Sequence, residues 1–98
     1  MDKINDIMHQ KVLDEIARLT HHGSESIVFA YRYGLCFKFY LDIKRRFHCA
    51  KAYYDSDHVI VHLFGRYYDA TGEVARVRHI DMIEHYPELY ERWVRRYG

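Results

Sequence analysis

The spacing of apolar residues changes once along this chain, and that change limits what it can fold into. As far as His48, apolar side chains recur every three to four residues, which is the repeat of amphipathic helices. From Ala50 the repeat shortens to about two, which is the repeat of strands with one buried face. The order of elements predicts an α+β fold, in which N-terminal helices pack on a small antiparallel sheet and a C-terminal helix closes the chain.

The periodicity places the individual elements. The segment from Ser26 to Arg32 is short and apolar and fits either an extended stretch or a helical turn. In the second helix we expect Phe37, Tyr40, Leu41 and Phe47 to face inward. The predicted elements are helices over Lys3–Thr20, Leu35–Phe47 and Pro87–Arg96 and strands over Ala50–Tyr54, His58–Phe64, Arg66–Ala70 and Glu73–Arg78.

Length and composition favour one globular domain over residues 1–98. The chain is 49% hydrophobic, which is enough for one core in 98 residues. Fifteen Lys and Arg balance fourteen Asp and Glu, so no excess charge points to nucleic acid or an anionic membrane. No apolar stretch approaches the roughly 20 residues of a membrane span, and Met1–Ile7 is too polar for a signal peptide. We therefore expect a cytoplasmic protein.

Cys36 is the first residue with an evident chemical use. Gly34 interrupts the chain just before it, and the second predicted helix begins at or near the cysteine. Unpaired N–H groups and the helix dipole at such an end favour thiolate over thiol, which makes a cysteine nucleophilic. The chain has two cysteines, too few for a disulfide scaffold; a bridge from Cys36 to Cys49 stays open, and free thiols are our expectation.

A histidine and a carboxylate follow in the order that a catalytic triad needs. A hairpin turn at Phe64-Gly65 would set Asp69 opposite Ile60, and diagonal to both His58 and His62 on one face of the sheet. A carboxylate there could orient either imidazole, so spacing leaves both histidines open as the partner of Cys36.

These segments resemble the core of papain-like cysteine hydrolases, most closely the compact NlpC-like and transglutaminase-like branches and small bacterial and phage proteins built on the same core. The matching motifs are Gly34-Leu35-Cys36, His58 to Val61, and Gly65 to Gly72. The resemblance implies Cys36 as nucleophile, His58 as base and then acid, and Asp69 as the residue that orients the imidazole. Tyr31 or Tyr33 would be candidates for an oxyanion site beside the Cys36 amide.

Other interpretations of the same residues lead to different expectations. His58 and His62 on one strand would lie about 13 Å apart, too far to share a zinc ion, so we expect no metal and no cofactor. The ten tyrosines suit either packing or a protein interface. Two functions remain. One is a cysteine hydrolase or acyltransferase acting on an amide, thioester or isopeptide bond of a protein or peptide. The other is a catalytically silent module of the same fold that modulates a host protein.

Overall fold

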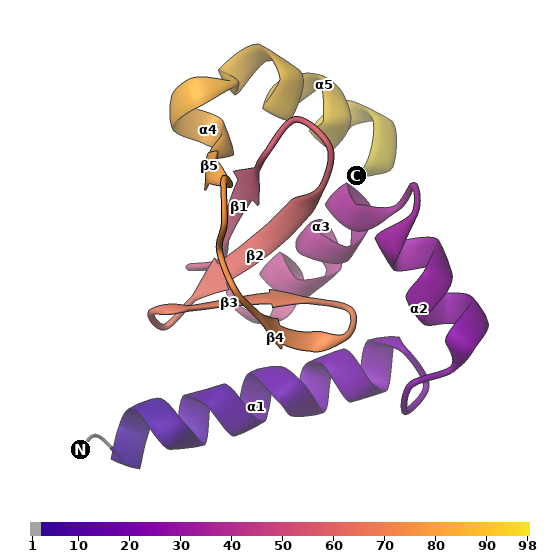
Figure 1. Cartoon of the computed structure of the whole chain (residues 1–98), viewed down its shortest axis with the longest axis vertical. Coiled ribbons are helices and arrows are strands. Elements are labelled where there is room, and N and C mark those ends of the chain that lie inside the picture. The colour runs from indigo at the N-terminus through magenta and orange to yellow at the C-terminus, as the bar shows by residue number, and fades with distance from the viewer. Residues whose placement is uncertain (1–2) are drawn as a thin grey trace.

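A computed structural model describes residues 3–98 and confirms the α+β architecture (Figure 1). Three helices come first, five short strands follow, and two helices end the chain. The helices are α1 (Lys3–Leu19), α2 (Glu25–Arg32), α3 (Cys36–Arg46), α4 (Met82–His85) and α5 (Pro87–Tyr97), and the strands are β1 (Lys51–Tyr54), β2 (Val59–Leu63), β3 (Arg66–Asp69), β4 (Gly72–Val74) and β5 (Ile80–Asp81).

The strands form one antiparallel sheet in the order β4-β3-β2-β1-β5. The β2–β3 hairpin has the predicted turn, with Phe64 and Gly65 both at positive φ, 52° and 77°. Positive φ at both central residues defines the tight turn that suits the twist of paired strands. Val61 therefore pairs with Tyr68 and Leu63 with Arg66, which is the register predicted from the sequence.

Helix α3 lies across one face of the sheet, and the core lies between them (Figure 1). The prediction for α3 was right for Phe37, Tyr40 and Phe47, but Leu41 is only partly buried. Phe39 and Ile43, at 1% and 0% exposure, are buried instead. Phe39 is buried because α2 packs on the far side of α3, where the Tyr31 ring lies 5.1 Å from the Phe39 ring.

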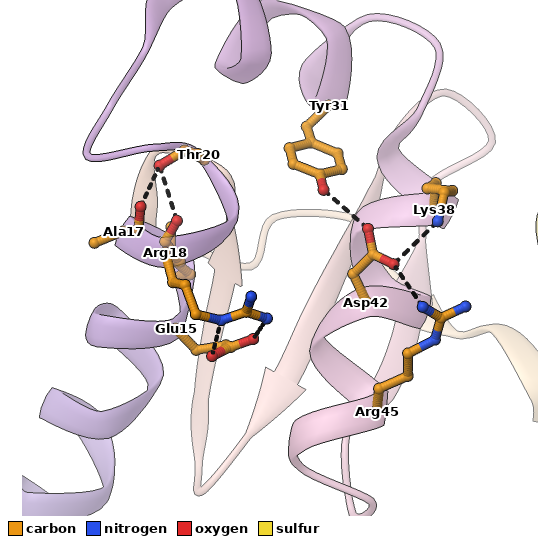
Figure 2. A network of polar contacts seen from close by, with 9 residues as sticks. Glu15, Ala17, Arg18, Thr20, Tyr31, Lys38, Asp42 and Arg45 are labelled. Carbon is orange, nitrogen blue, oxygen red and sulfur yellow. Dashed lines mark hydrogen bonds and ion pairs between the residues drawn. The ribbon is translucent and has the colours of Figure 1, made fainter.

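A polar network ties α2 to α3 (Figure 2). The Tyr31 hydroxyl donates a 2.9 Å hydrogen bond to Asp42, whose carboxylate also accepts from Lys38 at 3.1 Å. At the end of α1, the Thr20 hydroxyl donates to the Ile16 carbonyl at 2.8 Å and accepts from the N–H of Gly23. The Tyr31–Asp42 bond thus joins α2 to α3, and the Thr20 bonds order the turn between α1 and α2.

The segment after β4 differs from the prediction. A strand was expected over Glu73–Arg78, but β4 ends at Val74 and the chain crosses the outer face of the sheet to reach β5 (Figure 1). The Arg76 guanidinium lies 5.3 Å from the centre of the Tyr53 ring, and its Nε donates to the His79 carbonyl at 2.8 Å. After Val74 the segment is thus held against the sheet by the Arg76 side chain rather than by strand pairing.

Candidate active site

A glycine turn sets the position of Cys36. Gly34 connects α2 to α3 at φ 127°, a conformation that a residue with a Cβ rarely adopts. The Leu35 N–H then bonds back to the Ala30 carbonyl at 3.1 Å. Cys36 is the first residue of α3, and no side chain caps the helix. The half-buried thiol therefore lies at a helix end whose first N–H groups have no partner within the helix, and the Phe37 backbone there interacts with it.

An aspartate turn sets the position of His58. Asp55 Oδ1 accepts the N–H of Asp57 at 2.9 Å and the N–H of His58 at 2.7 Å. This is an Asx turn, which orders the loop just before β2 begins at Val59. The other carboxylate oxygen of Asp55 lies 3.5 Å from Nε2 of His79, which is buried. The backbone at His58 is therefore ordered by Asp55, which is itself in contact with His79.

Asp69, at the end of β3, is held by the turn that follows it. Its Oδ1 accepts the Thr71 N–H at 2.7 Å and also the Thr71 hydroxyl. Its second oxygen, Oδ2, lies 3.6 Å from Nε2 of His58. Asp69 is therefore both a turn residue and the neighbour of an imidazole, with a different oxygen engaged in each contact.

The surroundings of Cys36 favour its ionised form. Burial by itself raises the pKa of the thiol, because a thiolate is charged. Interactions of the thiolate with the His58 side chain and with the backbone of Val59 and Phe37 outweigh burial, so the pKa of Cys36 lies below its ordinary value. The helix start and the histidine therefore act in the same direction on this thiol.

The pKa of His58 is shifted in the opposite direction, upward. Asp69 contributes most and Cys36 next, and together they overcome burial and raise the pKa of His58 to about 9. The pKa of Asp69 is lowered: burial opposes the shift, but the contacts with His58 and Thr71 exceed it. Because Nε2 faces Asp69, Nδ1 is the ring nitrogen left for Cys36. The three side chains therefore favour a thiolate, an imidazolium and a carboxylate.

His62, the other histidine left open by the sequence, lies elsewhere. Its ring stacks on Tyr67 with centroids 4.5 Å apart, and its Nδ1 donates to the Arg66 carbonyl at 3.1 Å. Tyr31 is also directed away, since its hydroxyl bonds to Asp42. Tyr33 does border the cavity beside the thiol. Cys49 is exposed, and like Cys36 it is a free thiol.

A cavity of about 520 Å³ opens in front of the three side chains. Its walls come from the α2–α3 connection, the loop before β2 and helix α5. The residues that line it are Arg32, Tyr33, Gly34, Cys36, Phe37, Asp57, His58, Asp69, Trp93 and Tyr97. The space is large enough for a peptide side chain or a small acyl group.

Several residues that line the cavity or that support the loop before β2 were not identified from the sequence. Arg32, Trp93 and Tyr97 reach the cavity through the packing of α2 and α5 on α3, a long-range arrangement that periodicity does not encode. Asp55 had a local signal, because an aspartate in a short polar loop before a strand often accepts hydrogen bonds from the backbone N–H groups that follow it, as in an Asx turn. His79 carried no signal, because its contact with Asp55 depends on the path of the chain across the sheet.

We expect Asp55→Ala to slow alkylation of Cys36 severalfold and to lower the unfolding free energy by about 1–2 kcal/mol, because two hydrogen bonds that order the His58 loop are lost. Asp55→Asn keeps an acceptor oxygen and should restore most of both properties. Iodoacetamide labelling with peptide mapping, together with urea unfolding, measures the two effects. Unchanged labelling of a folded Asp55→Ala protein would show that His58 does not need this turn.

Comparison of the chain with family models, curated proteins and solved structures finds no match. Within residues 3–98, no cluster of three or more histidine, cysteine, aspartate or glutamate side chains is arranged to hold a metal ion. None of the helices in that range is both long and apolar enough to cross a membrane.

Proposed function

We propose that this protein is a small cysteine hydrolase or acyltransferase that acts on an amide, thioester or isopeptide bond through Cys36, His58 and Asp69. The strongest support is that the three side chains border one cavity, with the pKa of Cys36 lowered and that of His58 raised. A buried cysteine that served only packing would lack an ionising partner. The expected substrate is a protein or peptide, and the expected location is the cytoplasm.

The chemical steps follow from the positions of these groups. The Cys36 thiolate attacks the carbonyl carbon, so a C–S bond forms and the carbonyl electrons move to oxygen. N–H groups at the start of α3 stabilise that oxyanion. When the oxyanion collapses, the bond to the leaving amine or thiol breaks and the His58 imidazolium gives that group its proton. The product is a thioester on Cys36.

The second half restores the thiolate. Neutral His58 takes a proton from water or from an amine, which attacks the thioester carbon. A new C–O or C–N bond forms, the C–S bond breaks, and the sulfur leaves as thiolate beside the imidazolium. Water as acceptor gives hydrolysis, and an amine gives acyl transfer. Asp69 keeps the proton on Nε2 throughout, so that Nδ1 stays available for exchange with the substrate.

The first test uses 4-nitrophenyl acetate, a general acyl donor. We expect a rapid release of nitrophenolate equal to the protein present, then slower turnover, with the acetyl group on Cys36 by mass spectrometry. Cys36→Ala should abolish the rapid phase and Cys49→Ala should retain it. A folded protein that shows no rapid phase would contradict the proposal and favour the silent binding module of the same fold.

A second expectation compares the two thiols directly. Cys36 should react with iodoacetamide at neutral pH about tenfold faster than Cys49, because its pKa is lowered and thiolate is the reactive form. Peptide mapping after timed labelling measures both rates in the same molecule. Faster labelling of the exposed Cys49 would remove Cys36 as the nucleophile.

A further inference from the structure

The cavity beside Cys36 has an aromatic wall. The Phe37 ring meets the Trp93 ring edge-on at 5.5 Å and lies 6.3 Å from the Tyr97 ring, which joins the start of α3 to α5. Tyr33 adds another ring from the α2–α3 connection, and it is 62% exposed. A group that enters this cavity therefore meets largely aromatic surface near the thiol.

Arg32 adds a cation to that wall. Its guanidinium carbon lies 5.4 Å from the centre of the Tyr33 ring, and the side chain lines the cavity. A guanidinium held over a ring keeps its N–H edge free to donate. No ion pair within residues 3–98 involves Arg32, whereas Arg18 is paired with Glu15 and Arg66 with Glu73. The N–H edge of Arg32 is thus available to a ligand.

The charges of the other cavity residues restrict that ligand. The positive charge of His58 faces two negative charges, those of Asp69 and the Cys36 thiolate, so His58 has no excess positive charge to offer a ligand. Arg32 is then the remaining cation among the residues that line the cavity, and Asp57 is an anion there. One guanidinium matches a carboxylate through two parallel hydrogen bonds. A phosphate dianion would need more positive charge than one guanidinium supplies, and Asp57 would repel its two negative charges more strongly than the single charge of a carboxylate.

We propose that Arg32 binds a carboxylate on the acyl group that is delivered to Cys36. The preferred substrates are acyl donors with a second, free carboxylate on an apolar or aromatic body, which the rings of Tyr33, Trp93 and Tyr97 contact. This specificity rests on the proposed function only in taking Cys36 as the nucleophile. Arg32 is thereby a specificity-determining residue, separate from the three groups that carry the chemistry.

The test uses two alkylating reagents that differ only in charge, N-iodoacetyl-4-aminobenzoate and N-iodoacetyl-4-aminobenzamide. In both, the thiolate forms a C–S bond as the C–I bond breaks and iodide leaves. We expect the carboxylate reagent to label Cys36 about tenfold faster than the amide, with a rate that saturates as its concentration rises. In Arg32→Gln the ratio of the two rates should fall to that of free cysteine.

Arg96→Gln is the matched control. The Arg96 guanidinium also lies over the ring of the next residue, 5.5 Å from the centre of Tyr97, but Arg96 does not line the cavity. Removing it makes the same change in net charge and should keep the preference for the carboxylate reagent. A wild-type ratio equal to that of free cysteine, or a ratio that survives Arg32→Gln, would overturn the inference alone. Slow labelling of Cys36 by both reagents would contradict the proposed function and the inference together.

Discussion

Replacing His58 with alanine should slow both the alkylation of Cys36 at pH 7 and the rapid release of nitrophenolate by about tenfold or more, and should slow the later turnover by about a hundredfold. The interaction with His58 is the largest influence that lowers the pKa of Cys36, and burial acts against it. Without the imidazole this stabilisation of the thiolate is lost, so the pKa of the thiol rises from its wild-type position. Nitrophenolate leaves as an anion and needs no proton, but the slower turnover also loses the base that activates water against the thioester.

The pH dependence of the Cys36 alkylation rate should differ between the wild type and His58→Ala. In the wild type, the pKa of Cys36 is lowered and the pKa of His58 is raised to about 9. Thiolate and imidazolium therefore coexist at pH values between these two pKa values. The alkylation rate should therefore approach its plateau at a lower pH than that of free cysteine. In His58→Ala the rate should reach its plateau at a higher pH than in the wild type, because the pKa of the thiol is no longer lowered by the imidazole.

His62→Ala is the matched control, because it also removes an imidazole, and His62 was the other histidine that the sequence spacing allowed as the partner of Cys36. His62 contacts Tyr67 and the Arg66 carbonyl and does not border the cavity, so its removal should leave the pH profile in place. Measuring the melting temperature of both variants separates reactivity from folding. Loss of reactivity in His62→Ala, with His58→Ala unaffected, would reassign the base to His62.

The parts of the fold that follow from local chemistry could be predicted from the sequence. The Phe64-Gly65 turn fixes the β2–β3 register, and with it the position of Asp69 near the start of β2. Gly34 and the amphipathic run after it place Cys36 at a helix start. Turn chemistry and periodicity therefore indicated Cys36 and Asp69, but they left His58 and His62 both open, and only the resemblance to papain-like hydrolases favoured His58.

The parts that failed depend on contacts between distant segments. Helix α2 has only eight residues, a length over which apolar spacing did not distinguish a helical turn from an extended stretch. Phe39 is buried only because α2 folds back over α3. Strand β5 pairs with β1 across more than two dozen residues, and no local pattern specifies that pairing. The same holds for the approach of α5 to Cys36, which supplies the aromatic wall of the cavity.

Asp69→Asn should reduce acyl turnover roughly a thousandfold while the protein stays folded. The reason lies in the two contacts of the carboxylate. Thr71 donates both its N–H and its hydroxyl to Oδ1, so the amide oxygen of an asparagine would stay at that position. The amide nitrogen would then face Nε2 of His58, where Oδ2 now lies at 3.6 Å. A donor there favours the tautomer with its proton on Nδ1, and the base is blocked.

Asp69→Ala makes this prediction sharper. Alanine loses the Thr71 contacts and should cost more stability than asparagine, yet it places no donor against Nε2. If Asp69 orients the imidazole, asparagine should impair turnover of 4-nitrophenyl acetate at least as strongly as alanine, although its shape is closer to aspartate. If Asp69 served only the turn, asparagine would be nearly silent in activity and cost at most about 1 kcal/mol, with alanine the worse variant in both measurements. Melting temperature and turnover for the two variants thus rank in opposite orders only when the carboxylate acts through His58.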